Sequence, residues 1–171
     1  MANNPEKKLS NYENVYYKYS EVKEIGRGHA GDKWMKRILQ QFEDYLKDIK
    51  LNNNTALPPR PSSLPILCVL TNPNSILDFG GSSGWVWFYL KQCIDDLSVK
   101  KYDIVEINEI CNQFKNSEYH KLEPINYSTI DDYESNCDIL YANSVIQYVA
   151  EDQVFFHLIE KSCPKYLLIE E

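Results

Sequence analysis

The chain has 171 residues, 43% of them hydrophobic, and carries 18 basic against 25 acidic side chains, for a net charge of −7. This length and apolar content fit one domain with a real core and argue against global disorder. The negative charge argues against a protein that binds nucleic acid by neutralising phosphates. The charge is also uneven, since residues 1–75 carry 11 basic and 8 acidic side chains and residues 76–171 carry 7 and 17.

The N-terminal third is predicted to be a helical arm with a linker. Residues 1–30 are polar and rich in tyrosine, which favours an irregular lead-in. Apolar residues recur every three or four positions from Asp32 to about Ile49, which predicts an amphipathic helix. Three asparagines in a row and three prolines over 51–63 are typical of a loop. We therefore predict an N-terminal helical arm and Pro-rich linker over 1–62 and a separate domain over 63–171.

Short apolar runs alternate with helical segments in the rest of the chain. The predicted strands are Ser75–Phe79, Tyr102–Glu106, a weak one within Leu122–Tyr127, Cys137–Tyr141 and Tyr166–Ile169. The predicted helices are Leu64–Leu70, Ser82 to about Cys93, Glu109 to about Lys115, and one across Val145–Tyr148 and Gln153–Lys161. Continuous apolar strands that alternate with helices indicate a mostly parallel sheet covered on both faces. The predicted fold class is therefore α/β, with a Rossmann-like sheet of five strands.

A glycine-rich turn, Asp78-Phe79-Gly80-Gly81-Ser82-Ser83-Gly84, follows the first predicted strand. A turn of this kind that opens a helix is a common ligand seat, although it can also be an ordinary tight turn. The dinucleotide spacing G-x-G-x-x-G fails here in both registers and occurs only at Gly26, Gly28 and Gly31, where no apolar strand precedes it. S-adenosylmethionine fits the turn better, because it carries an ammonium group and no phosphate, and anionic Asp78 would attract the first and repel the second.

Glu106 comes at the end of the second predicted strand. A carboxylate in this position can accept hydrogen bonds from both hydroxyls of a ribose. The alternative is a solvated carboxylate with no ligand.

These pieces resemble a class I S-adenosylmethionine-dependent methyltransferase. The closer resemblance is to a group of methyltransferases encoded in bacterial capsule, O-antigen and other surface-polysaccharide gene clusters. It rests on four segments and covers about residues 62–171: Phe79–Gly84, Ile104–Ile107, Asn143–Tyr148 and Tyr166–Glu171. Two positions depart from that group, because Ile107 replaces a glutamine and Glu170-Glu171 replaces an Asp-Arg pair.

The resemblance implies S-adenosyl-L-methionine as the cofactor and a saccharide or other small-molecule acceptor. The cofactor-binding residues expected from it are Asp78, Phe79, Gly80, Gly81, Ser82, Gly84, Glu106, Ile107, Asn143 and Ser144. Gln147, Tyr148 and His120 are the candidates for a catalytic role, although Gln147 and Tyr148 could equally start a helix. The family has two further strands after the fifth, so we expect a C-terminally shortened chain with an exposed apolar edge at 166–169. The alternatives are that this edge is covered by a second copy or by the N-terminal arm.

Two rival functions remain open at this stage. An NAD-dependent nucleotide-sugar enzyme would need the dinucleotide loop and a Y-x-x-x-K pair after the fourth strand, and the one such spacing, Tyr19 to Lys23, comes too early. The other rival is a non-catalytic scaffold or partner subunit with the same fold.

The remaining expectations concern location and metals. No stretch approaches the roughly 20 apolar residues of a membrane span, and the polar N-terminus lacks the apolar core of a signal peptide. Five widely spaced cysteines without a C-x-x-C pair predict neither a disulfide framework nor a metal site. We therefore expect a cytoplasmic protein.

Overall fold

The computed structural model describes residues 31–51, 62–115, 117–118, 121, 123–149 and 152–170. Within them, five strands form one sheet: β1 (Ser75–Phe79), β2 (Lys101–Val105), β3 (Ile125–Ser128), β4 (Ile139–Asn143) and β5 (Tyr166–Glu170). The helices are α1 (Asp32–Leu51), α2 (Leu64–Thr71), α3 (Trp85–Cys93), α4 (Asn108–Phe114) and α5 (Asp152–Ser162), with a short 3-10 turn η4 (Ile146–Tyr148). None of the described helices is long and apolar enough to cross a membrane.

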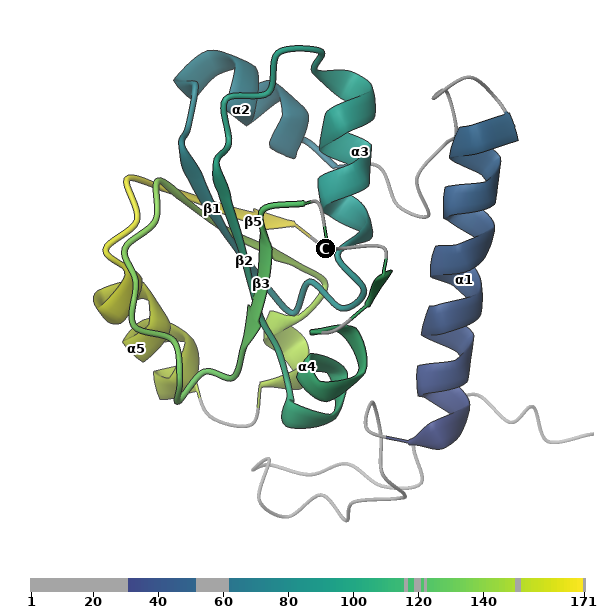
Figure 1. Cartoon of the computed structure of the whole chain (residues 1–171). Coiled ribbons are helices and arrows are strands. Elements are labelled where there is room, and N and C mark those ends of the chain that lie inside the picture. Colours follow the sequence, from purple (N-terminus) through teal and green to yellow (C-terminus); the bar gives the residue numbers. More distant parts are fainter. Residues whose placement is uncertain are drawn as a thin grey trace, which may run out of the picture.

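The sheet has the strand order β3-β2-β1-β4-β5, and all four pairings are parallel. The α/β, Rossmann-like fold with five strands is therefore confirmed. The chain winds outward from β1 in one direction through β2 and β3, then returns to β4 and β5 on the other side (Figure 1). In such sheets, ligands bind beyond the carboxyl ends of the strands at the point where the order reverses, which here lies between β1 and β4.

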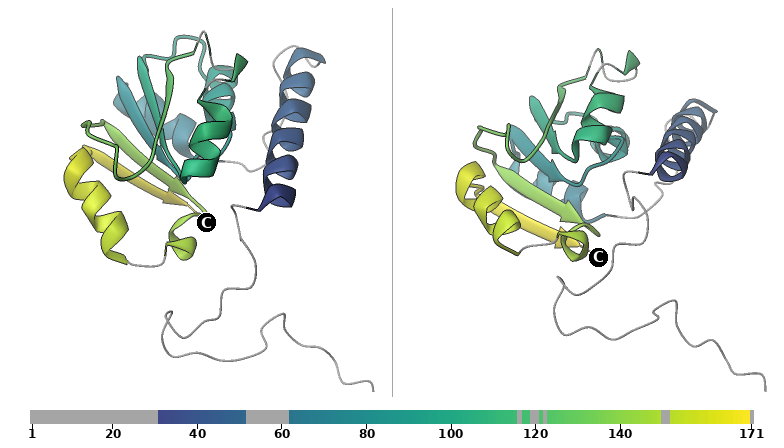
Figure 2. Two further views of the ribbon diagram at one scale, coloured as in Figure 1. Left: turned by 60° about the horizontal axis from the view of Figure 1, so that its bottom comes forward. Right: turned by 90° about the horizontal axis from the view of Figure 1, so that it is seen from below.

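Residues of β1, β2 and β4 divide between two different apolar clusters. Ile76 and Tyr102 belong to the cluster beneath α1, α2, α3 and α4, whereas Leu77 and Leu140 belong to the cluster beneath α5. Figure 2 shows α5 on one side of the sheet and the other helices on the opposite side. The helices therefore cover both faces, as the continuous apolar strands predicted.

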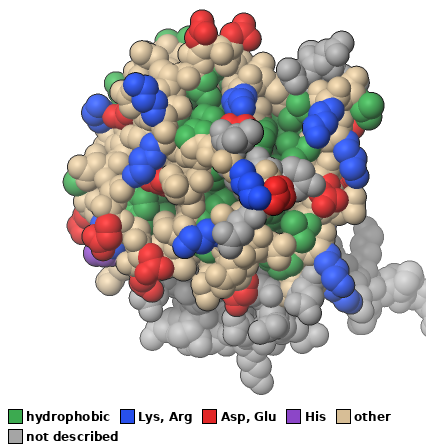
Figure 3. Space-filling view, in the orientation of Figure 1, with side chains coloured by type: hydrophobic (Ala, Val, Ile, Leu, Met, Phe, Trp, Pro, Cys, Tyr) green, Lys and Arg blue, Asp and Glu red, His purple; other side chains and the backbone are tan. Residues whose placement is uncertain are grey.

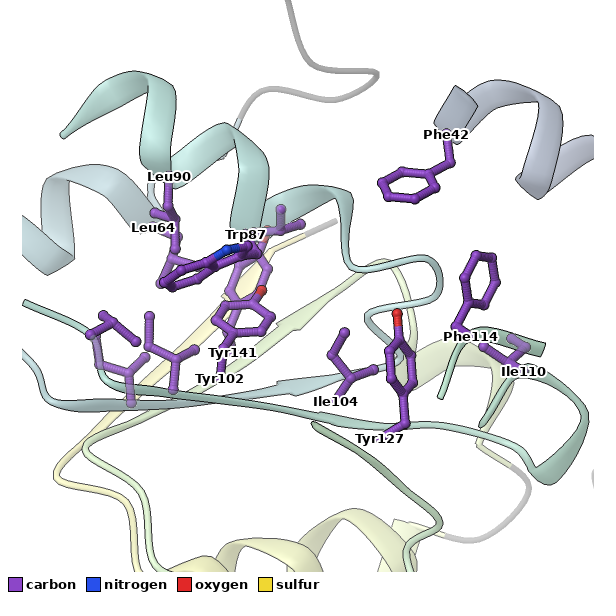
Figure 4. Close-up of a cluster of buried hydrophobic side chains, with 14 of the residues drawn as sticks. Phe42, Leu64, Trp87, Leu90, Tyr102, Ile104, Ile110, Phe114, Tyr127 and Tyr141 are labelled. Atoms are coloured by element: carbon purple, nitrogen blue, oxygen red, sulfur yellow. The ribbon is translucent and has the colours of Figure 1, made fainter. Parts of the chain in front are cut away.

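Helix α1 shares the larger of these two clusters. Phe42 is 2% exposed and its ring centroid lies 5.6 Å from that of Phe88 and 6.1 Å from that of Phe114. In Figure 4, Phe42 reaches from α1 toward Phe114, beside the residues that line the sheet. Helix α1 thus packs against α3 and α4 through its apolar stripe.

Two predicted helices begin or end differently in the structure. The helix expected from Ser82 begins at Trp85, because Ser82 and Gly84 adopt left-handed conformations with φ of 53° and 73°. The helix expected across Val145–Tyr148 is only the 3-10 turn η4, whose last residue is followed by extended Val149. Both differences lie at the carboxyl edge of the sheet.

Charged side chains do not gather into one patch on the face that Figure 3 shows. Basic and acidic groups are interspersed there, with apolar surface between them. That face therefore lacks the continuous basic stripe that a phosphate backbone would require.

Candidate functional site

The turn after β1 is held in place by backbone hydrogen bonds. Gly80 N–H donates to the carbonyl of Val105 at 2.9 Å, which ties the turn to the end of β2. Gly84 N–H donates to the carbonyl of Gly81 at 2.9 Å, and α3 begins at the next residue. The turn thus brings the first N–H groups of α3 to the carboxyl edge of the sheet.

Two glycines of this turn have no room for a side chain. A Cβ atom on Gly80, whose φ is 73°, would lie 2.4 Å from a methyl group of Val145. A Cβ atom on Gly81 would lie 2.5 Å from the carboxyl group of Asp78. The backbone of the turn therefore rests directly on the segment after β4 and on the Asp78 carboxyl.

Asp78 lies beneath the turn and is 2% exposed. Its carboxylate accepts a hydrogen bond of 2.6 Å from the Tyr102 hydroxyl of β2. Burial raises the pKa of Asp78 to about 7, the bond from Tyr102 acts in the opposite direction, and nearby Glu106 adds to the rise. The carboxyl group is therefore held under the loop at a cost in free energy.

Glu106 follows β2 directly and lies on the other side of the same turn. Its carboxylate accepts the backbone N–H of Ser82 at 3.1 Å and that of Ile107 at 2.9 Å. Burial raises the pKa of Glu106, against the effect of these two bonds. Across the described residues, none of the ion pairs involves Asp78 or Glu106. Two carboxylates thus flank the turn, and neither forms an ion pair with a cation in the part of the chain that the structure describes.

The residues at the end of β4 and just after it also lie at the carboxyl edge of the sheet. Ser144 has a left-handed φ of 51°, and its backbone N–H donates to the carbonyl of Glu170 at 2.9 Å. The Asn143 amide donates to the Tyr141 hydroxyl at 2.8 Å, and its carbonyl oxygen accepts the Ser144 hydroxyl at 3.0 Å. The Asn143 side chain is therefore held by its own neighbours.

Glu170, at the end of β5, has a role that the sequence did not suggest. Its carboxylate accepts the backbone N–H of Ser63 at 2.6 Å and the Tyr141 hydroxyl at 2.9 Å. Partial burial works to raise the pKa of Glu170, but these bonds and those from Ser62 hold it below its ordinary value. Glu170 thus fastens the start of α2 to the end of β5, and no local sequence signal could have found a partner 107 residues away.

Replacing Glu170 by alanine should lower the free energy of unfolding by about 1 to 2 kcal/mol, because the N–H of Ser63 and the Tyr141 hydroxyl lose their acceptor. The loss should shrink as the pH falls through the lowered pKa of Glu170, since the protonated group is the weaker acceptor in the unsubstituted chain. Urea unfolding at pH 7 and pH 4 measures both effects. The control is Glu160→Ala on exposed α5, and an equal effect of the two substitutions would contradict this role.

The structure brings most of the predicted cofactor-binding residues to one edge: Asp78, Gly80, Gly81, Ser82, Gly84, Glu106, Ile107, Asn143 and Ser144. Phe79 differs, because its side chain is buried on the α5 side, with its ring centroid 5.5 Å from that of Phe155. Gln147 and Tyr148 lie in η4 with exposed side chains. His120 and the pattern of Gly26 and Gly28 lie outside the described residues.

No protein-family model matches the chain, and no curated protein matches it either. Solved structures that resemble it include the O-methyltransferase from Bacillus cereus in complex with SAH (15% identity, TM-score 0.45, 77% of this chain and 66% of that one). Another is the SAH-bound methyltransferase of Podospora anserina (10% identity, TM-score 0.47, 83% of this chain and 68% of that one). A third is human N-acetylserotonin methyltransferase in complex with SAM (16% identity, TM-score 0.45, 84% of this chain and 40% of that one). The chain thus spans between 40% and 68% of the length of these three structures. Such distant likenesses leave the activity to be argued from the residues.

Proposed function

We propose that this chain is an S-adenosylmethionine-dependent methyltransferase. The observation that carries the proposal is the pair of carboxylates, Asp78 and Glu106, that flank a glycine turn at the start of α3 with no cation among the described residues. A ligand for this turn should bring positive charge and hydroxyl donors, since both carboxylates accept hydrogen bonds but neither forms an ion pair within the described residues. S-adenosylmethionine brings an ammonium, a sulfonium and two ribose hydroxyls, whereas a dinucleotide would bring a pyrophosphate against the same two carboxylates.

Each part of the edge has a role in this proposal. The negative charge of Asp78, beneath Gly81, attracts the ammonium group, and the first N–H groups of α3 face the cofactor carboxylate. Glu106 accepts the ribose hydroxyls in place of the Ser82 N–H that it now binds. Ile107, which is 40% exposed beside Glu106, offers an apolar surface to the adenine. Asn143 and Ser144 border the methionine end.

When bound, the cofactor would supply an electrophilic methyl group for transfer to an acceptor oxygen, with its thioether sulfur as the leaving group. The chain has to hold the acceptor in line with the methyl–sulfur bond and to let the hydroxyl proton leave. Gln147 and Tyr148 are exposed at the same edge and are our candidates for contacting the acceptor. They are polar and uncharged, which suits a hydroxyl-rich acceptor.

For the acceptor we propose a sugar hydroxyl or another substituent of a bacterial surface polysaccharide. This part rests on the sequence resemblance of the loop and of the Asn143–Tyr148 segment. The proposal places the reaction in the cytoplasm and includes self-association of two copies through the strand edge at 166–169. It also takes residues 63–171 as the cofactor domain and 1–62 as the arm.

Calorimetric titration tests the proposal. We expect heat with S-adenosylhomocysteine and none with NAD, and Glu106→Ala should weaken S-adenosylhomocysteine binding by about 30-fold or more, because two hydrogen bonds to a carboxylate are lost. The matched control is Glu109→Ala, three residues along at the start of α4, where the side chain is exposed. Binding of NAD alone would overturn the proposal, and binding with no methyl transfer to any polysaccharide precursor would favour the non-catalytic scaffold.

A further inference from the structure

A chain of hydrogen bonds runs along the carboxyl edge of the sheet from the end of β5 to the end of β4. The Glu170 carboxylate lies 2.9 Å from the Tyr141 hydroxyl, and that hydroxyl lies 2.8 Å from the side-chain amide nitrogen of Asn143. The carbonyl oxygen of the Asn143 side chain lies 3.0 Å from the Ser144 hydroxyl. A carboxylate on β5 is thus linked to the two polar residues that the proposed function sets at the methionine end of the cofactor.

The charge of Glu170 decides the direction of these hydrogen bonds. Partial burial acts to raise the pKa of Glu170, but the hydrogen bonds that its oxygens accept hold the pKa below its ordinary value. The group is therefore a carboxylate at neutral pH and can only accept. The single hydroxyl proton of Tyr141 points to Glu170, because a carboxylate is a stronger acceptor than the Ser62 hydroxyl 3.0 Å away. The Tyr141 oxygen is then an acceptor toward Asn143.

This direction fixes which way the Asn143 amide faces. Only its NH2 group can donate to the Tyr141 oxygen, so its carbonyl oxygen is turned to the other side, where it accepts the Ser144 hydroxyl. A carbonyl oxygen has two lone pairs, and the Ser144 hydroxyl uses one of them. Asn143 and Ser144 are both only partly buried, so the second lone pair can accept from a ligand at the edge of the sheet.

The register of the sheet sets this amide beside the glycine turn. Phe79 is the partner of Ala142 across the pair of β1 and β4, so Asn143 follows at the level of Gly80. A Cβ atom on Gly80 would lie 2.4 Å from a methyl group of Val145, which shows how closely the turn approaches the segment after β4. The Asn143 amide therefore lies where the strand order reverses, which is where such sheets bind their ligands.

We propose that Tyr141 and Glu170 are positioning residues that turn the Asn143 carbonyl oxygen toward the ammonium group of S-adenosylmethionine. An ammonium group can only donate hydrogen bonds, so a carbonyl oxygen suits it and an NH2 group in the same place would repel it. The inference rests on the proposed function, because it takes S-adenosylmethionine as the ligand. It gives Glu170 a second role besides the contact that holds the start of α2.

Calorimetric titration with two ligands tests the inference. S-adenosylhomocysteine carries the ammonium group, whereas methylthioadenosine has the same adenosine and sulfur but lacks both the ammonium and the carboxylate. Tyr141→Phe should weaken S-adenosylhomocysteine binding about tenfold, because the Asn143 amide loses the acceptor that orients it. It should change methylthioadenosine binding by less than about twofold. The matched control is Tyr133→Phe, at a buried tyrosine in the cluster beneath α5, which should change neither.

Glu170→Gln is the second variant, since it keeps the size of the side chain and removes its charge. The new amide oxygen can still accept the Ser63 N–H, which sets the new NH2 group toward the Tyr141 hydroxyl. The hydrogen bond between them then reverses, and the hydroxyl proton can turn to Asn143 and flip its amide. We expect a loss for S-adenosylhomocysteine at least as large as in Tyr141→Phe, again with less than about a twofold change for methylthioadenosine.

A double-mutant cycle shows whether Tyr141 acts through Asn143. In an Asn143→Ala background, Tyr141→Phe should weaken S-adenosylhomocysteine binding by less than about a further twofold. Equal losses for both ligands, or a full tenfold further loss in that background, would overturn the inference and leave the hydrogen bonds a purely structural role. Retained binding of methylthioadenosine also shows that each variant is folded.

The same titrations separate this inference from the proposed function. If the unsubstituted chain binds neither ligand, both fail. If it binds S-adenosylhomocysteine and the Tyr141→Phe and Glu170→Gln variants bind it equally well, the positioning role is wrong and the methyltransferase proposal stands.

Discussion

Asp78→Asn should make the protein more stable at pH 8 and less able to bind the cofactor. The pKa of Asp78 rises from 3.8 to about 7 on folding, mainly because the group is buried. The folded state therefore binds a proton more tightly than the unfolded state, so stability falls as the pH rises from about 4 to about 7 and is level above that. Asparagine is neutral throughout and should recover up to about 4 kcal/mol at pH 8, since the rise of about three pKa units corresponds to about 1.4 kcal/mol for each unit.

Urea unfolding at pH 5, 6, 7 and 8 measures this effect. The decrease of the free energy of unfolding with rising pH should be smaller in Asp78→Asn but should not vanish, because the raised pKa of Glu106 acts in the same direction. Tyr102→Phe is the informative companion, since it removes the one hydrogen bond that lowers the pKa of Asp78 and should steepen the slope. If the pH dependence of stability were unchanged in Asp78→Asn, the Asp78 carboxyl group would not be its cause. Asp78→Asn should also abolish detectable binding of S-adenosylhomocysteine. A substitution that stabilises the fold would then remove function, which is common at charged sites.

The second large effect is expected at Gly81. Its added Cβ in Gly81→Ala would lie 2.5 Å from the Asp78 carboxyl group, closer than real contacts allow. Relief requires the turn or the buried Asp78 carboxyl group to move, which should cost about 2 to 3 kcal/mol of stability and change the geometry proposed to hold the cofactor. Because φ at Gly81 is not in the left-handed range, the loss comes from the contact and not from backbone strain.

A double-mutant cycle separates this contact from a general defect of the turn. Asp78→Ala removes the atoms that the new Cβ would meet, so the combined loss of Gly81→Ala and Asp78→Ala should be smaller than the sum by at least about 1 kcal/mol. If the two losses of stability were additive, the destabilisation by Gly81→Ala would not come from its contact with Asp78. Chemical denaturation of the four proteins at pH 8 is sufficient, because the cycle compares stabilities and needs no ligand.

Much of this fold was predictable because its rules are local. A few neighbouring residues are enough to recognise the apolar runs of β1, β2 and β4 and the apolar stripe of α1. The glycine turn can be recognised from its composition. The start of α3 was predicted three residues early, because nothing in Ser82-Ser83 shows that Ser82 adopts a left-handed conformation. In that conformation the Ser82 N–H donates to Glu106, which follows β2 and lies 24 positions further along the chain.

The positions of the candidate site residues were predictable to the same extent. Asp78 and Glu106 follow from strand ends and spacing, since parallel strands bring their carboxyl ends together. The Tyr102 hydroxyl beneath Asp78 and the Glu170 contact with Ser63 did not follow, because each joins side chains from distant parts of the chain. Tertiary contacts of this kind leave no trace in local composition.

The contact between Ser63 and Glu170 has a consequence for how the protein is made. The two residues are 107 positions apart, and the central strand β1 pairs with β4, which is synthesised some sixty residues later. A nascent chain that has only reached β3 therefore holds β1 with one edge open and α2 without its anchor. We expect the sheet to close late and slowly, as in other proteins dominated by long-range pairing. Until then we expect the unpaired edges of the apolar strands to be prone to pairing with other chains.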